Sequence, residues 1–327
     1  MSKSNDSNLS EMRVGDLLMT EHSLGIIEVT PRQAGENSTA YVYSCGIHGN
    51  ETAPIEIVND MLADIESGVL KIKNPLLIIF GNIQAMREGK RFIENNLNRM
   101  FSREHKKYDI EDDEPKRAKE IEESISVFFN KYKNLNKVHY DLHTAIRPSK
   151  YPKFAVYPSL KEGRCYSKNQ LKLLSTMGLG AVLLMHKFSP TLSYYSSTTH
   201  GAEAFTLELG KVEKFGDNIR PNFKDTEEVL RSLVSGEKFE TSNKYPKLCQ
   251  VKKELIRHEQ EYDFKISDDT ANFTEFKKGT VLASDSVETY KVEEDGEMIA
   301  FPNGNVKVKQ RSGLIMRVVS PSDIQIV

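Results

Sequence analysis

The stretch Ala40-Tyr41-Val42-Tyr43-Ser44-Cys45-Gly46-Ile47-His48-Gly49-Asn50-Glu51 changes character at its centre. Residues 40–45 are apolar at almost every position, which is typical of a strand buried between two layers of helices. A glycine-flanked turn follows, and residues 51–65 then have helical periodicity. The turn carries His48 and Glu51, which can supply two of the three protein ligands that a catalytic zinc ion needs. The pair alone also fits a capping or surface pair, because His-x-x-Glu arises by chance.

The same alternation of strand and helix continues to about residue 236. Further buried strands are expected at Leu76–Phe80, Val138–Leu142, Ala181–Met185 and Ala204–Leu209, and helices at Glu51–Ile65, Glu114–Tyr132 and Asp225–Val234. Alternating elements of this kind predict an α/β fold, a mixed sheet flanked by helices on both faces.

The pattern changes beyond residue 236. Residues 236–247 are polar and contain a proline, as in a linker, and strand patterns follow at Val306–Lys309 and Leu314–Val319. We therefore expect a catalytic domain over residues 1–240 and a smaller all-β domain over residues 241–327. Two roles for this β-rich tail stay open: covering the active site, or forming the interface of a homo-oligomer.

Composition excludes several classes of partner. The 327 residues include 45 Lys and Arg against 47 Asp and Glu, a net charge of −2, so no overall field attracts nucleic acid or a membrane surface. No apolar run is long enough to cross a membrane, and Met1–Arg13 lacks the apolar core of a signal peptide. Three widely separated cysteines indicate a reducing compartment, and we expect a cytoplasmic protein.

The third metal ligand is best sought where another strand ends, since open α/β sheets place their sites there. His139, Asp141 and His143 alternate along one such strand and so share a face. His143, at the tip, is the better ligand. His139 lies deeper and fits a structural histidine, and Asp141 fits a carboxylate that orients a ligand histidine.

Glu208 is the candidate general base. It is a single carboxylate in the apolar run Thr206-Leu207-Glu208-Leu209-Gly210, where burial raises the pKa of a carboxyl toward the range useful for proton transfer. A structural ion pair with Lys211 is the alternative.

Arginines near the proposed ligands indicate an anionic substrate. Arg91, Asn98 and Arg99 belong to one loop-like segment, and Arg147 follows His143 by four residues. A guanidinium group binds a carboxylate through two points.

Four segments in this order resemble the succinylglutamate desuccinylase/aspartoacylase family, which is related to zinc carboxypeptidases. They are residues 46–51, Asn96-Leu97-Asn98-Arg99, Asp141-Leu142-His143-Thr144-Ala145 and Leu207-Glu208-Leu209-Gly210-Lys211. The resemblance covers most of the chain, including the β-rich tail. Aspartoacylases carry an arginine between a tyrosine and the glutamate base, and residues 194–200 here have none. The sequence is thus more similar to the desuccinylase branch.

The resemblance implies one zinc ion per chain on His48, Glu51 and His143, with Glu208 as the base. It implies that Arg91 polarises the scissile carbonyl and that Asn98 and Arg99 bind a substrate carboxylate. Arg147 is a further candidate for binding a carboxylate.

The implied substrate is a small dicarboxylic N-acyl amino acid. The implied reaction is hydrolysis of N-succinyl-L-glutamate to succinate and L-glutamate, the last step of succinyl-dependent arginine catabolism. Two other functions stay open: a deacylase of another acidic N-acyl amino acid, and a non-catalytic scaffold that binds metabolites.

Overall fold

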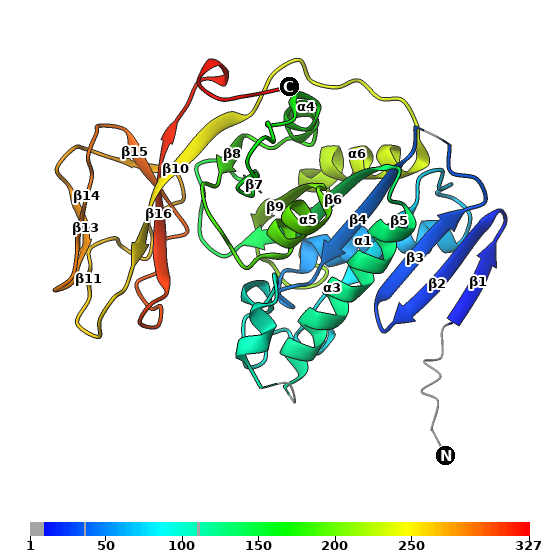
Figure 1. The fold of residues 1–327 in the computed structure, drawn as a ribbon, viewed down its shortest axis with the longest axis horizontal. Helices are drawn as coiled ribbons and strands as arrows, with labels where there is room; N and C mark the ends of the chain where they lie inside the picture. Colours follow the sequence, from blue (N-terminus) through cyan, green and yellow to red (C-terminus); the bar gives the residue numbers. More distant parts are fainter. Residues whose placement is uncertain (1–9, 36, 110–111) are drawn as a thin grey trace. The chain divides into compact units, whose positions relative to one another are not determined.

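The computed structural model describes residues 10–35, 37–109 and 112–327 (Figure 1). The first nine residues of Met1–Arg13, the segment expected to lack the apolar core of a signal peptide, lie outside these ranges. Contacts divide the chain into two compact units, residues 1–144 with 188–241 and residues 145–187 with 242–327. Among the described residues, no helix combines the length and apolar character that a membrane span requires.

The first unit is built on a mixed sheet. Its strands, in spatial order, are β1 (Ser10–Val14), β2 (Leu17–Ser23), β3 (Ile26–Pro31), β5 (Leu76–Phe80), β4 (Thr39–Cys45), β6 (Asn136–Ala145) and β9 (Glu203–Lys211). Strand β4 runs parallel to both β5 and β6, whereas β1, β2 and β3 form an antiparallel meander that joins β5. The expected mixed sheet is thereby confirmed.

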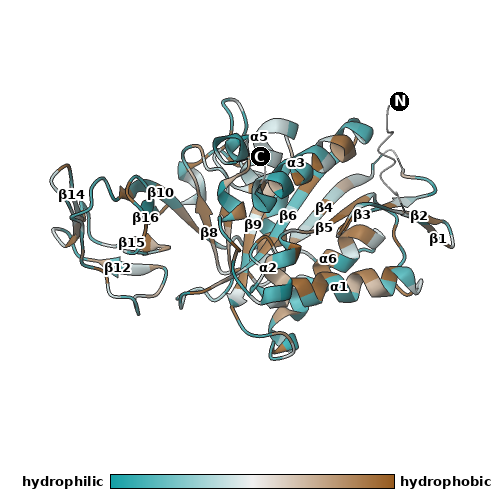
Figure 2. Ribbon diagram, turned by 90° about the horizontal axis from the view of Figure 1, so that it is seen from below, coloured by the Kyte–Doolittle hydropathy of each residue, from teal (hydrophilic) through white to brown (hydrophobic). Residues whose placement is uncertain are grey.

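Helices cover both faces of this sheet (Figures 1 and 2). They are α1 (Thr52–Glu66), α2 (Ile83–Glu88), α3 (Asp113–Lys131), α5 (Leu192–His200) and α6 (Lys224–Ser235), with short 3-10 helices at Leu97–Arg99, Glu104–Lys107 and Arg220–Phe223. The ribbons of α1 and α3 carry both hydrophobic and hydrophilic residues in Figure 2, as amphipathic helices should.

The hydrophobic core on the α3 side of the sheet includes apolar residues that recur along one face of this helix. Ile121, Ile125, Phe128 and Phe129 of α3 pack with Val42 of β4 and are fully or almost fully buried. On the opposite face the Tyr43 hydroxyl donates to the backbone carbonyl of Leu230 in α6 at 3.0 Å. Successive residues of β4 therefore contact helices on opposite faces of the sheet.

The second unit combines a small α/β portion with a β-rich tail. Its elements are β7 (Phe154–Tyr157), α4 (Lys168–Thr176), β8 (Ala181–Leu184), β10 (Lys247–Ile256), β11 (Asp263–Phe264), β12 (Thr274–Phe276), β13 (Val281–Ser284), β14 (Thr289–Lys291), β15 (Glu297–Ala300), β16 (Arg311–Val318) and a 3-10 turn at Pro321–Asp323. Strand β10 pairs with β8 in parallel and with β16 antiparallel. The expected β-rich tail is confirmed, and residues 237–246 form the expected connecting segment without helix or strand. The division into domains at residue 240 stays a prediction.

One expected strand is wrong. Residues 306–309 form a loop, and Lys309 has a left-handed φ of 68°. Arg257 takes the hydrogen bonds that a neighbouring strand would have made: its carbonyl accepts from the Lys309 amide at 2.6 Å, and its guanidinium donates to the Val306 carbonyl at 3.0 Å. Alternating residue types therefore do not suffice for a strand when the backbone finds hydrogen-bond partners in a loop instead.

Candidate metal centre and active site

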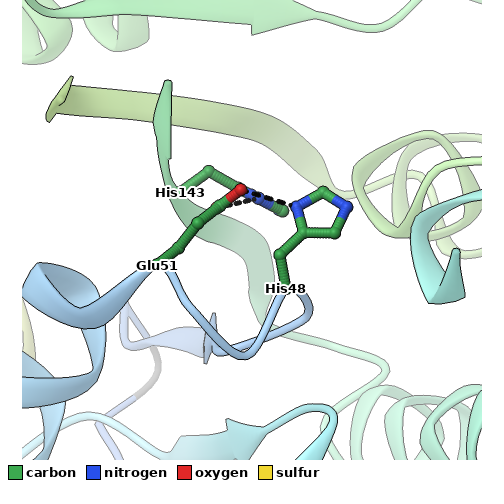
Figure 3. A group of neighbouring side chains, drawn as sticks. All are labelled: His48, Glu51 and His143. Atoms are coloured by element: carbon green, nitrogen blue, oxygen red, sulfur yellow. Dashed lines mark hydrogen bonds and ion pairs between the residues drawn. The ribbon is translucent and has the colours of Figure 1, made fainter. Parts of the chain in front are cut away.

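The turn between β4 and α1 brings His48 and Glu51 to His143 on β6 (Figure 3). Gly46 begins this turn with a φ of 64°, a conformation that side chains disfavour. Because β4 and β6 are parallel neighbours, with Ser44 opposite Asp141, the turn after β4 lies beside the end of β6. The predicted triad is thus assembled by strand pairing across almost a hundred residues.

Glu51 lies between the two histidines. Its Oε1 is 2.8 Å from His48 Nδ1, and its Oε2 is 2.8 Å from His143 Nδ1. One ligand atom from each residue lies within 4.8 Å of the others, and all three side chains are buried. Two imidazole nitrogens and one carboxylate oxygen are a donor set used for catalytic zinc.

The Nδ1 atom of His48 directs its lone pair toward Glu51. Its Nε2 lies 3.0 Å from Asn96 Oδ1, an oxygen that also accepts from the Asn98 backbone amide, so Nε2 must donate. Burial lowers the pKa of His48 to about 4, which leaves Nδ1 unprotonated at neutral pH. Within the described residues Nδ1 has no hydrogen-bond partner of proper geometry despite its approach to Glu51. An unprotonated nitrogen facing a carboxylate oxygen fits a shared cation.

The other two triad residues, Glu51 and His143, form an ion pair in which each favours the charged form of the other. Burial disfavours the charged form of Glu51, but the two histidines outweigh it and hold the pKa of Glu51 well below its usual value. Burial likewise disfavours charged His143, but Asp141 and Glu51 raise the pKa of His143 well above its usual value. A metal ion bound by the triad would displace the His143 proton, because only the neutral imidazole is a ligand.

A buried polar chain continues behind His143. Asp141 Oδ2 lies 3.0 Å from His143 Nε2, and Asp141 Oδ1 accepts from the Ser44 hydroxyl at 2.6 Å. The Ser44 hydroxyl also contacts His139 Nε2 at 2.8 Å, and His139 Nδ1 contacts the Ser196 hydroxyl of α5 at 2.7 Å. His139 is fully buried and lies outside the triad. This geometry suits the structural role expected for His139 and the orienting role expected for Asp141.

Glu208 on β9 is buried, as its apolar strand predicted. Burial, reinforced by the negative charge of Glu51, raises the pKa of Glu208 to about 7. Its Oε2 has no hydrogen-bond partner among the described residues. A carboxyl that gains and loses a proton near neutral pH suits a general base, and a bound dication would lower this pKa by attraction.

The three predicted anion-binding residues of the 91–99 segment take different positions. Arg91 donates to Glu51 Oε1 at 2.6 Å, which places its guanidinium beside the triad. Asn98 is buried, with Nδ2 at 3.5 Å from His143 Nε2 and Oδ1 accepting from the Leu192 amide. Arg99 is exposed and donates to the Asn98 carbonyl at 2.7 Å.

Arg147 belongs to the second unit. Its guanidinium donates to the Asp268 carboxylate at 2.8 Å and to the Asp268 carbonyl. Its proposed contact with substrate stays a prediction.

Three contributors went unpredicted. Asn96 fixes the orientation of His48, Ser44 bonds to Asp141, and Glu114 accepts four hydrogen bonds near the Arg91 segment. Asn96 belongs to a quoted motif, but no local pattern indicates that its partner lies 48 positions away.

Comparisons with known proteins agree with this architecture. The family described as Succinylglutamate desuccinylase/Aspartoacylase catalytic domain matches residues 38–234, and the AstE/AspA barrel-sandwich hybrid domain matches residues 246–319. A succinylglutamate desuccinylase of Pseudoalteromonas atlantica is 42% identical over 296 residues, covering 89% of this chain and 84% of the relative.

Solved structures show the same relationship. The succinylglutamate desuccinylase of Vibrio parahaemolyticus superposes with a TM-score of 0.88 at 32% identity, covering 96% of this chain and 92% of that one. The enzyme of Chromobacterium violaceum superposes with a TM-score of 0.84 at 34% identity, covering 97% and 96% of the two chains. With its catalytic segment and its β-rich tail both matched over nearly their whole length, the chain belongs to the succinylglutamate desuccinylase/aspartoacylase family.

Proposed function

We propose that this protein is a metal-dependent amidohydrolase that cleaves N-succinyl-L-glutamate into succinate and L-glutamate. The observation that carries the proposal is the buried His48, Glu51 and His143 triad with the carboxyl group of Glu208 nearby, titrating close to neutrality. Relatives named for this activity cover most of the chain. The site residues proposed for the chemistry all fall within the predicted catalytic domain, residues 1–240.

Zinc is the proposed metal, one ion per chain, because two neutral imidazoles and a carboxylate leave a coordination position open for the reaction. When bound, the ion supplies positive charge that makes a water molecule more acidic and offsets negative charge on the carbonyl oxygen.

Glu208 is the proposed base. Its carboxylate takes a proton from the attacking water, whose oxygen bonds to the succinyl amide carbon. It then gives that proton to the departing nitrogen as the carbon–nitrogen bond breaks, so the products are succinate and glutamate. Burial raises the pKa of this carboxyl above its usual value, and a carboxyl shifted in this direction can both accept and return a proton near neutral pH.

The cationic segment is proposed to hold the substrate. Arg91, which donates to Glu51, is proposed to donate to the amide oxygen as negative charge develops there. Asn98 and Arg99 are proposed to bind a carboxylate of the glutamate half, and carboxylate binding by Arg147 stays a separate prediction. The substrate is thus oriented by charge at points away from the scissile bond.

The test is a comparison of kcat/KM for three substrates: N-succinyl-L-glutamate, N-acetyl-L-aspartate and a dipeptide with a C-terminal glutamate. We expect the succinyl compound to be hydrolysed at least about a hundred-fold more efficiently than the others, since mispaired buried charges cost several kcal/mol. Preference for N-acetyl-L-aspartate would assign the chain to aspartoacylase-like chemistry. Absence of hydrolysis with stoichiometric metal bound would favour a binding scaffold.

A further inference from the structure

We propose that Glu114, on the first turn of α3, is a positioning residue that holds the substrate-binding segment 91–99 in its working conformation. The inference rests on the proposed function, because it assigns Arg91, Asn98 and Arg99 to the substrate. It adds a residue remote from the metal ligands to the determinants of substrate affinity.

Each carboxylate oxygen of Glu114 accepts two hydrogen bonds, and the donors belong to this segment and to the Asn82 side chain. Oε1 accepts from the Ile93 amide at 2.7 Å and from Asn82 Nδ2 at 2.8 Å. Oε2 accepts from the Glu94 amide at 3.0 Å and from the Asn95 amide at 2.5 Å. Glu114 is only 5% exposed, so water does not compete freely for these four bonds.

The segment lacks regular structure of its own over residues 91–96. Three consecutive backbone amides therefore depend on the one carboxylate, in place of the ladder or helix that would normally satisfy them. An acidic residue in a first turn ordinarily stabilises its own helix through the dipole. Here the side chain is directed to another segment, which indicates a role beyond helix stability.

Both ends of the anchored stretch contact the metal centre. On one side, Arg91 donates to Glu51, and its carbonyl accepts from the Gly49 amide at 3.1 Å. On the other side, Asn96 contacts His48 and begins the 3-10 turn that carries Asn98 and Arg99. A displacement of residues 93–95 must therefore move the substrate contacts.

A second buried carboxylate of α3 also anchors the chain near the substrate-binding segment. Glu122, eight residues on and 6% exposed, accepts from the Arg103 amide at 3.2 Å. The inner face of α3 thus holds the chain before and after Asn98 and Arg99, through two carboxylates that hydrophobic packing alone would not require.

The experiment compares Glu114→Gln and Glu114→Asp with a control, Glu123→Gln. Glu123 lies on the same helix, with its side chain 66% exposed and 3.8 Å from Lys119. The glutamine has nearly the shape of glutamate, but its amide nitrogen cannot accept, so it turns two of the four acceptor contacts into donor–donor contacts. The aspartate keeps both oxygens on a shorter side chain.

Two readouts are measured: kcat and KM for N-succinyl-L-glutamate at saturating zinc, and hydrogen–deuterium exchange of the peptide spanning residues 91–99. For Glu114→Gln we expect KM to rise about ten-fold or more with a smaller change in kcat, metal content at saturation unchanged, and faster exchange in this peptide. Glu114→Asp should fall between wild type and Glu114→Gln, and Glu123→Gln should match wild type.

The proposal is overturned if Glu114→Gln has the KM and the exchange of Glu123→Gln. If Glu114→Gln does not fold, Glu114→Asp decides: wild-type KM and exchange in that variant overturn the proposal, and an increase in both supports it. If the wild type fails to hydrolyse the substrate, the proposed function is wrong, and exchange alone then decides whether Glu114 anchors the segment.

Discussion

The guanidinium groups of Arg99 and Arg91 have different hydrogen-bond partners. Arg91 is fixed against Glu51, whereas Arg99 is exposed and its guanidinium is held by the adjacent Asn98 carbonyl. Arg91 is thus partly buried beside the triad, whereas Arg99 is open to solvent. Their substitutions should therefore affect different kinetic constants.

We expect Arg99→Lys to raise KM about ten-fold while kcat stays within about two-fold, because lysine retains the charge but loses the two-point contact. Arg87→Lys, an exposed change on α2, is the control. Steady-state kinetics check this, and an unchanged KM would remove Arg99 from the substrate site.

Between elements, helix α2 packs closely against the ligand turn. A Cβ added at Gly49 would lie 2.2 Å from the Ala85 carbonyl carbon and 2.3 Å from the Met86 nitrogen. Both atoms are backbone, so neither can rotate away. Gly49 therefore permits the contact that fixes the turn between His48 and Glu51.

Gly49→Ala should lower zinc affinity about ten- to hundred-fold, the range found when residues that support metal ligands are changed. Gly35→Ala is the matched control, since among the described residues the nearest contact of a Cβ there would be the Ser38 hydroxyl, at 3.8 Å. Competition with a chromogenic chelator measures the affinity. Equal affinities for the two variants would show that the contact does not matter.

Strand β3 and helix α3 are joined by Glu28. Its carboxylate accepts from Lys131 Nζ at 2.7 Å and lies 2.9 Å from His22 Nε2. Burial raises the pKa of Glu28, but these two partners outweigh it and lower that pKa to about 2. A lowered native pKa adds stability above the unfolded value of 4.5, and this contribution disappears as pH falls toward 2.

Glu28→Gln should therefore lower the free energy of unfolding at pH 7 by about 1–3 kcal/mol, a range that allows for solvent screening at Lys131. The difference from wild type should shrink between about pH 4.5 and pH 2. Urea unfolding across this range, with exposed Glu11→Gln as control, provides the measurement. A pH-independent difference would mean that packing, rather than charge, is responsible.

For the whole molecule, the limits of sequence reasoning are physical. The strands buried on both faces, such as β4 and β5, were predictable because continuous apolar runs allow few alternatives. The meander β1 to β3 carries polar residues on its partly exposed strands and gave no comparable signal. Helix α5 is rich in Ser, Thr and Tyr, which have modest helix propensity, and its burial among neighbours overrides that preference.

The residues of the site likewise include some that the sequence predicted and some that it did not. His48, Glu51 and His143 lie in short motifs, so the sequence predicted that they would meet. Asn96, Ser44 and Glu114 act through contacts between distant segments, and their chemistry is ordinary for surface amides, hydroxyls and acids. Only the assembled fold distinguishes them.

Metal binding should be coupled to the stability of the unit that contains the triad. At free zinc about a hundred times Kd, binding adds about 2.7 kcal/mol, which corresponds to a rise in Tm of about 5–10 °C for a unit of this size. Calorimetry of chelator-treated and zinc-reloaded protein checks this, with His143→Ala expected to show no rise. A Tm that is insensitive to zinc would argue against a site at the triad.

The central claim is that the triad holds the metal while Glu208 moves the proton, and one measurement on Glu208→Gln tests both parts. Bound metal and the kcat for succinate release are determined on the same sample, with Glu203→Gln at the start of the same strand as control. The account predicts about one metal ion per chain and a kcat lowered by about two to four orders of magnitude, the usual contribution of a general base. A variant that binds its metal fully and releases succinate at the wild-type rate would contradict it.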